Sequence, residues 1–161
     1  GGVVRGAAEV RRHLEDPDAE VPLLPTAARY DALFQMSNPL RVVTSGIEAP
    51  AEQSFFASGR WRMVERRPWW EDYEDPVPVV FGHYWRWYDP AVGGRFSRGE
   101  RNLFGSAGPY ALLGPARNAI CVDYSVGVRY GLGGRLAALR WPERELVFDD
   151  GERGPLVAPV S

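Results

Sequence analysis

The sequence contains no lysine, one cysteine and only two histidines, and it has no long uninterrupted hydrophobic run. The single cysteine, Cys121, excludes an internal disulfide, and because it lies within the apolar run NAICVDY we expect it to be a buried core residue. The short hydrophobic runs argue against a membrane span and no signal-peptide pattern is present, so we expect a cytoplasmic protein with no membrane partner. The formal net charge is only −2 and the charges are dispersed, so we expect no nucleic-acid partner.

The sequence does contain enough apolar material for a folded domain, because 45% of its 161 residues are hydrophobic. Residues 1–38 are predicted to be mainly helical: apolar positions recur at helical spacing over residues 3–15, and Thr26 can cap a second helix. Residues 39–161 are predicted to be rich in strands. We therefore expect the α/β class, with the whole chain in one partial domain.

The strand-rich part contains several short apolar runs separated by glycine or proline. In order, the runs are RVVTS (41–45), RWRMVER (60–66), VPVVF (77–81), NAICVDY (118–124), LAALRW (136–141) and ELVFD (145–149). We expect these runs to form strands, the last of them being the final strand of the fold. Trp141 and Pro142 predict the turn that precedes it.

Glycine and proline are concentrated between residues 89 and 117. A connection of this length in a compact domain is usually functional or disordered, so we expect a long surface excursion. Its arginines could meet a substrate phosphate if the segment lies beside a site; they are Arg95, Arg98 and Arg101.

One histidine stands at a position that suits a functional side chain. The stretch PVPVVFGHYWRWYD, residues 76–89, runs from an apolar strand directly into Gly82 and His83. Glycine lets the backbone turn sharply, and we expect His83 at the carboxyl end of a central strand. Neutral imidazole is a common ligand of transition metals, so His83 is a candidate metal ligand. The alternative is a half-buried histidine that is hydrogen-bonded to a backbone carbonyl.

Three short motifs in a fixed order strengthen this candidate: FGHY at 81–84, VDY at 122–124 and GGRLA at 133–137. Together they resemble the C-terminal part of calcineurin-like metallophosphoesterases, in the branch of bacterial serine/threonine phosphatases and symmetrical diadenosine tetraphosphatases. The resemblance covers about residues 76–149. It implies the C-terminal half of that family's α/β sandwich, which is a strand-rich mixed sheet with a short helical N-terminal region.

The sequence also departs from this family, which binds two metal ions through further motifs. Asp-x-His, Gly-Asp-x-x-Asp and Gly-Asn-His-Asp/Glu are all absent here. The other histidine, His13, has charged neighbours on a predicted helix and is expected to be solvated. Trp85 stands where many members carry a second histidine, which fits the branch with a single one. The resemblance thus implies a fragment that is inactive alone and whose missing N-terminal half supplies the other ligands.

For the full-length parent, the resemblance implies a phosphoesterase that hydrolyses phosphate esters or phosphoanhydrides with a metal-activated water. Its substrate would be a small molecule or a phosphoprotein. Its cofactors would be two divalent ions (Mn, Fe, Zn or Ni), with His83 as one ligand. The candidates for orienting His83 or lying near the substrate are Asp123, Tyr84 and Arg86.

Simpler explanations for these side chains stay open at this point. Asp123 is equally consistent with a carboxylate that stabilises a turn at a strand end. Arg86 is more often a surface arginine stacked on Trp85 or Trp87, and large aromatic residues at strand ends usually cover the core. If the aromatic and arginine side chains instead form an exposed surface, the protein would be a non-catalytic domain that binds a partner or a nucleotide.

Overall fold

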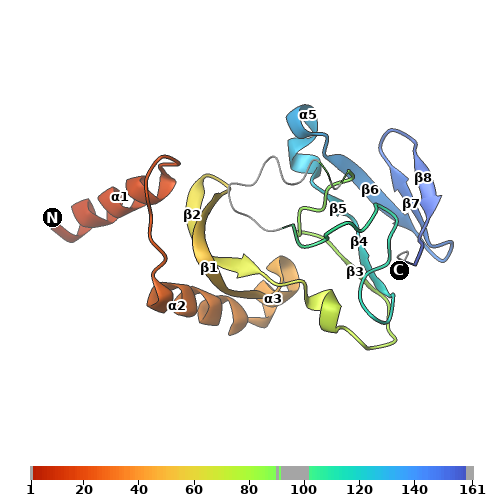
Figure 1. Ribbon diagram of the computed structural model, residues 1–161, viewed down its shortest axis with the longest axis horizontal. Coiled ribbons are helices and arrows are strands. Elements are labelled where there is room, and N and C mark those ends of the chain that lie inside the picture. Colours follow the sequence, from red (N-terminus) through yellow and green to blue (C-terminus); the bar gives the residue numbers. More distant parts are fainter. Residues whose placement is uncertain (1, 90, 92–101, 159–161) are drawn as a thin grey trace. The chain divides into compact units, whose positions relative to one another are not determined.

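A computed structural model describes residues 2–89, 91 and 102–158 of the chain (Figure 1). Their contacts cluster in two compact units, residues 2–67 and the described residues from 68 onward, and each unit is described by itself. Helices and strands occur together, so the general α/β class is confirmed. In the described part of the chain, no helix is long and apolar enough to cross a membrane.

The first unit begins with three helices, α1 (Gly2–Glu15), α2 (Pro25–Met36) and α3 (Pro39–Ser45). The first two were predicted, but Thr26 is not a cap: Leu24 is the N-cap residue and Pro25 opens the helix. The expectation of a strand over 41–45 was wrong, because these residues form α3. The Asn38 side chain accepts hydrogen bonds from the N–H groups of the first turn, which starts this helix despite its apolar residues.

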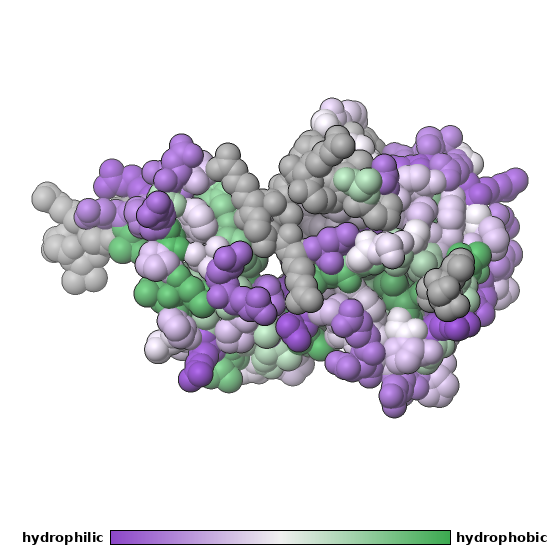
Figure 2. Space-filling model, viewed as in Figure 1, coloured by the Kyte–Doolittle hydropathy of each residue, from purple (hydrophilic) through white to green (hydrophobic). Residues whose placement is uncertain are grey.

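An antiparallel hairpin completes the first unit. It pairs β1 (Glu48–Ala57), which the sequence did not predict, with β2 (Arg60–Arg66), which it did. Helix α2 packs against both strands and buries the small side chains of Ala28 and Ala32. Its larger apolar side chains are exposed, and Figure 2 shows hydrophobic residues in green on the surface of this unit. Because α2 is apolar on both faces, hydrophobicity alone does not identify its packing face.

The second unit begins with a short 3-10 helix, η1 (Trp69–Asp72), and then a parallel pair of strands, β3 (Val79–Phe81) and β4 (Ala119–Cys121). These segments meet in an apolar cluster whose buried members are Trp70, Tyr84, Phe104, Leu113, Ala119 and Cys121. The prediction that Cys121 is a buried core residue is therefore confirmed.

Four antiparallel strands form the other sheet of this unit, in the order β5 (Asp123–Tyr124), β6 (Arg135–Arg140), β7 (Glu145–Phe148) and β8 (Arg153–Pro155). The short helices η2 (Val126–Val128) and α5 (Arg129–Leu132) connect β5 to β6. The expectation that residues 145–149 form the last strand was wrong, since β8 follows and pairs with β7. A second cluster, formed by Tyr124, Leu146 and Phe148, covers one face of this sheet.

The segment from 89 to 117 is not a surface excursion where it is described. Phe104 and the run Ala111–Leu113 are buried, and the backbone of Leu113 exchanges hydrogen bonds with Ala119 at the start of β4. Apolar burial at Phe104 and Ala111–Leu113, together with backbone pairing, therefore anchors this segment to the core, while other residues between 102 and 117 are exposed. The expectations for Arg95, Arg98 and Arg101 lie outside the described residues.

Candidate functional site

The parallel pair of β3 and β4 brings two loops to one edge. Phe81 is paired with Cys121 at the carboxyl end of the pair, and the Val122 N–H donates to the Phe81 carbonyl at 2.9 Å. The residues after each strand, 82–88 and 122–125, therefore leave from the same edge, where α/β sheets commonly hold ligands. Among the described residues β3 has a strand on one side only, so it is not the central strand that we expected.

The carboxylate of Asp123 joins the two loops. Its Oδ2 accepts a hydrogen bond from the Trp85 N–H at 3.1 Å, and its Oδ1 accepts one from the Ser125 N–H at 2.9 Å. Asp123 thus follows β4, the strand paired with the one that precedes His83, and its hydrogen bonds are to Trp85 and Ser125. These contacts support the interpretation of Asp123 as a strand-end turn carboxylate, and they extend it, since the same carboxylate also fixes the loop that carries His83.

The backbone at this edge is strained at residues other than glycine. His83 has φ 69°, Trp85 has φ 54° and Ser125 has φ 57°, a left-handed conformation that costs an L-residue about 1–2 kcal/mol. Gly82 is not among the residues with positive φ, so the left-handed backbone conformation after β3 occurs at His83 and not at the glycine. Strain of this kind persists only where surrounding contacts enforce it, and it is concentrated at functional sites.

Side chains alternate in exposure along the loop after Gly82. His83 and Trp85 are exposed, whereas Tyr84 and Arg86 are buried. Tyr84 is 5% exposed and packs edge-on against Trp70, with ring centroids 5.1 Å apart. Tyr84 is therefore part of the core beneath the loop, and the side chains that this loop presents to solvent are those of His83 and Trp85.

Arg86 is 1% exposed, so it is not the surface arginine that the sequence favoured. Its Nη2 donates to the Gly108 carbonyl, and its guanidinium lies 5.3 and 5.4 Å from the ring centroids of Phe104 and Tyr124. Its Nε has no hydrogen-bond partner. Its own carbonyl accepts from the Ser125 Oγ at 3.0 Å. Because it is buried, this guanidinium does not reach a phosphate in solvent. Arg86 instead anchors the loop to the core through its hydrogen bond to the Gly108 carbonyl.

The possible ligands for a metal ion at this edge are few. Within the described ranges, no group of three or more His, Cys, Asp or Glu side chains could hold a metal ion. His13 is exposed on α1, in the other compact unit, as expected for a solvated residue. His83 fits one imidazole position of a metal site, but the described residues do not fit a complete one.

Cys121 does not add a nucleophile. Burial raises the pKa of its thiol to about 12, and the Sγ lies 3.7 Å from the Asp123 carbonyl as a weak donor. A thiol with such a pKa is protonated at neutral pH, and the thiolate is the reactive form. This cysteine is therefore structural.

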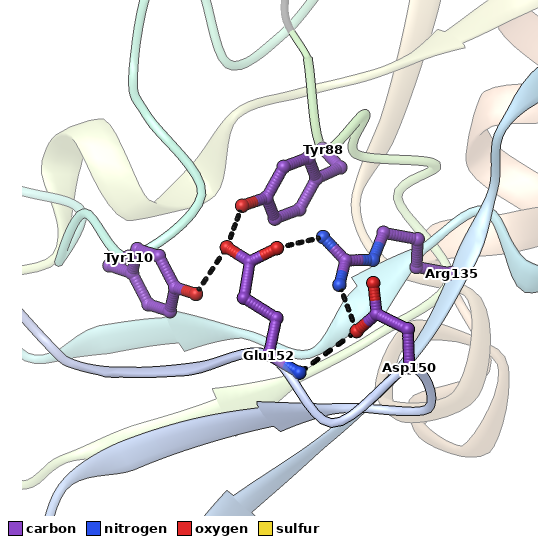
Figure 3. Close-up of polar contacts among 5 residues, drawn as sticks. All are labelled: Tyr88, Tyr110, Arg135, Asp150 and Glu152. Atoms are coloured by element: carbon purple, nitrogen blue, oxygen red, sulfur yellow. Dashed lines mark hydrogen bonds and ion pairs between the residues drawn. The ribbon is translucent and has the colours of Figure 1, made fainter.

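A polar cluster that the sequence did not predict lies in the same unit (Figure 3). Its members are Tyr88, Tyr110, Arg135, Asp150 and Glu152. Glu152 lies 64 residues after its partner Tyr88, and no motif or periodicity links residues so far apart. The hydrogen bond to Glu152 raises the pKa of Tyr88, and burial does the same for Tyr110, so both phenols are donors.

Comparison with known proteins yields no match: no family model, no curated protein and no solved structure shows significant similarity to this chain.

Proposed function

We propose that this chain forms the C-terminal part of a dinuclear metal-dependent phosphoesterase and supplies one imidazole ligand, His83. The observation that carries the proposal is the exposed His83 itself, held at φ 69° at the carboxyl edge of a parallel strand pair. The strained backbone at His83 costs free energy, and because the side chain is exposed its burial does not offset that cost. A metal ligand needs a fixed orientation, and this requirement explains why a strained backbone would be kept at this position.

The residues of this chain would act mainly by orientation. Asp123 holds the backbone of Trp85, two residues after His83, and Ser125 holds the carbonyl of Arg86. His83 would therefore meet an ion without first ordering its own loop, which reduces the entropic cost of binding. Bound divalent ions would supply a hydroxide at neutral pH for attack on phosphorus.

The same proposal includes the finer fold and the remaining ligands. The motifs FGHY, VDY and GGRLA, which carry the resemblance to metallophosphoesterases, fall at the end of β3, across β5 and at the start of β6. The other ligands and the substrate pocket would come from a preceding half of the full-length protein.

The test is hydrolysis of p-nitrophenyl phosphate by the full-length protein with Mn²⁺. His83→Ala is expected to lose nearly all activity and to weaken the binding of one ion, because it removes an imidazole that would bind that ion directly. His13→Ala is the matched control, and it should leave both quantities unchanged. Activity of His83→Ala equal to that of the wild-type protein would contradict the assignment.

The alternative of a binding surface made of aromatic and arginine side chains has less support. Tyr84 and Arg86 are buried, and Trp85 is the exposed aromatic residue of the loop, with 40% of its surface accessible. A single exposed ring is a weak platform for a nucleobase or a partner, since such platforms combine several rings with accessible cations.

A further inference from the structure

Glu152, in the turn between β7 and β8, accepts hydrogen bonds from Tyr88 and Tyr110, the residues that flank the segment from 89 to 109. Its Oε1 accepts a hydrogen bond from the Tyr88 hydroxyl and another from the Tyr110 hydroxyl, the latter at 2.9 Å (Figure 3). Its Oε2 accepts from the Arg135 Nη1 at 2.9 Å. Three donors thus converge on one carboxylate, and an anion is the acceptor that best satisfies them.

Arg135, on β6, holds this carboxylate in place. Its guanidinium lies 4.0 Å from the ring centroid of Tyr88 and 4.2 Å from that of Phe148, and its side chain is 13% exposed. Its Nη2 also pairs with Asp150, which in turn accepts the backbone N–H of Glu152 at 3.0 Å. With these partners the Glu152 carboxylate is held against the sheet by several hydrogen bonds, although 42% of its side chain is exposed.

The first connection from Glu152 to His83 runs through Tyr88. Tyr88 is the fifth residue after His83 and lies in the loop that begins at Gly82. The β3 strand and the Asp123 hydrogen bond hold the first part of this loop. Glu152 holds its last part, so the loop is fixed at both ends.

The second connection runs through Tyr110. The two residues before it offer their carbonyls to the core: Gly108 accepts from Arg86, and Pro109 accepts from the Tyr124 hydroxyl. Strand β8 also packs closely against Tyr110 at Gly154. A Cβ added at Gly154 would lie 2.9 Å from the Tyr110 ring, which is closer than normal packing allows. Tyr110 therefore helps to position the Gly108 carbonyl, which accepts the hydrogen bond from the Arg86 guanidinium. Arg86 is the third residue after His83.

We propose that Glu152 is a positioning residue for His83, which fixes the direction of the candidate metal ligand through Tyr88 and through Tyr110 and Arg86. The inference rests on the proposed function, in which His83 binds a divalent ion. It assigns no reaction to the tyrosines, because Glu152 uses them as hydrogen-bond donors.

The experiment uses the ring signals of the two histidines of the full chain, recorded by NMR at one fixed pH. They are assigned with His13→Ala, and His13 serves as an internal reference in the other compact unit. Mn²⁺ is added, and the paramagnetic broadening of the His83 ring gives an apparent affinity even if binding is weak. Glu152→Gln is compared with Glu145→Gln, which removes a carboxylate that also pairs with an arginine of β6, Arg140.

In Glu152→Gln we expect a shifted and broadened His83 ring signal and an Mn²⁺ affinity about tenfold lower, in the range found for residues that orient metal ligands. In Glu145→Gln we expect a wild-type His83 signal. An unchanged His83 signal and unchanged Mn²⁺ affinity in Glu152→Gln would overturn the proposal. If Glu152→Gln does not fold, Tyr88→Phe, which keeps the Glu152–Arg135 pair, must give the same shift at His83, and its absence would overturn the proposal.

The outcomes separate this proposal from the proposed function. Mn²⁺ that broadens His83 equally in the wild-type chain and in Glu152→Gln supports the metal role and contradicts the positioning role. A His83 ring that moves in Glu152→Gln supports the positioning role whether or not Mn²⁺ broadens it, and the metal role is then decided by the p-nitrophenyl phosphate assay of His83→Ala in the full-length protein.

Discussion

Asp123 and Trp85 lie 38 residues apart in sequence, yet the Trp85 N–H donates a hydrogen bond of 3.1 Å to the Asp123 carboxylate. The other carboxylate oxygen accepts from Ser125, in its own loop. Trp85 and Ser125 both have left-handed backbones. One side chain therefore stabilises two strained turns at the edge where β3 and β4 end, and the conformation of the His83 loop depends on a residue of the other loop.

Replacing Asp123 by Asn should loosen this edge. Asn keeps one acceptor oxygen and turns its amide group toward the other N–H, so one hydrogen bond is lost. We expect a decrease of about 1–2 kcal/mol in the free energy of unfolding, measured by urea titration. Faster hydrogen exchange at the Trp85 or Ser125 amide would locate the loss, and wild-type protection at both would contradict the role of Asp123.

The backbone strain at His83 predicts a difference between two substitutions that both remove the imidazole. Glycine adopts positive φ without a Cβ penalty, so His83→Gly should be about 1 kcal/mol more stable than His83→Ala. Both variants should lose the response to Mn²⁺. Equal stabilities of the two variants in urea titrations would mean that the left-handed turn at His83 is not strained.

The sequence predicted the elements whose patterns are local, such as α1 and β2, because periodic apolar positions report them. It missed α3, where a cap at Asn38 outweighs β-branched residues, and β8, which has no apolar pattern of its own. The Gly-His position at the end of a strand was also predictable. The hydrogen bonds of Asp123 to Trp85 and Ser125 and the polar cluster around Glu152 were not predictable, since they depend on tertiary contacts.

Arg86 predicts an unusual pair of stability effects. Its buried guanidinium donates to the Gly108 carbonyl and lies over the rings of Phe104 and Tyr124, but its Nε has no hydrogen-bond partner, so the cost of burying the charge is only partly compensated. Arg86→Met keeps most of the packing and should change the free energy of unfolding by no more than about 1 kcal/mol. Arg86→Ala leaves a cavity and should cost about 3 kcal/mol. Equal losses for both variants would show that the charge itself stabilises the core.

Cys121 should be unreactive in the folded protein. Because burial raises the pKa of its thiol to about 12, almost no thiolate is present at pH 8, and solvent does not reach the sulfur. A disulfide reagent such as 5,5′-dithiobis(2-nitrobenzoate) should react only as fast as the chain unfolds, and rapidly in urea. Fast stoichiometric labelling of the native chain would contradict this expectation.

The cluster around Glu152 predicts how stability depends on acid. Hydrogen bonds from Tyr88, Arg135 and Tyr110 lower the pKa of Glu152, and a backbone hydrogen bond from Glu152 together with Arg135 lowers that of Asp150. A carboxyl whose pKa is lower in the folded state stabilises the fold above its unfolded pKa, which is about 4. The stabilisation is lost as the pH falls through the folded pKa.

Wild-type protein should therefore lose stability between about pH 5 and pH 2 more steeply than Glu152→Gln, which has no carboxyl at this position. The two unfolding free energies, measured by urea titration at each pH, should differ most near neutral pH and converge in acid. In Glu145→Gln the ion pair with Arg140 is lost instead, and the pH dependence of its unfolding free energy should follow that of the wild-type protein more closely. A constant difference between wild type and Glu152→Gln over this range would mean that the charge of Glu152 does not contribute, and that hydrogen bonding to a neutral side chain is sufficient to hold Tyr88 and Tyr110.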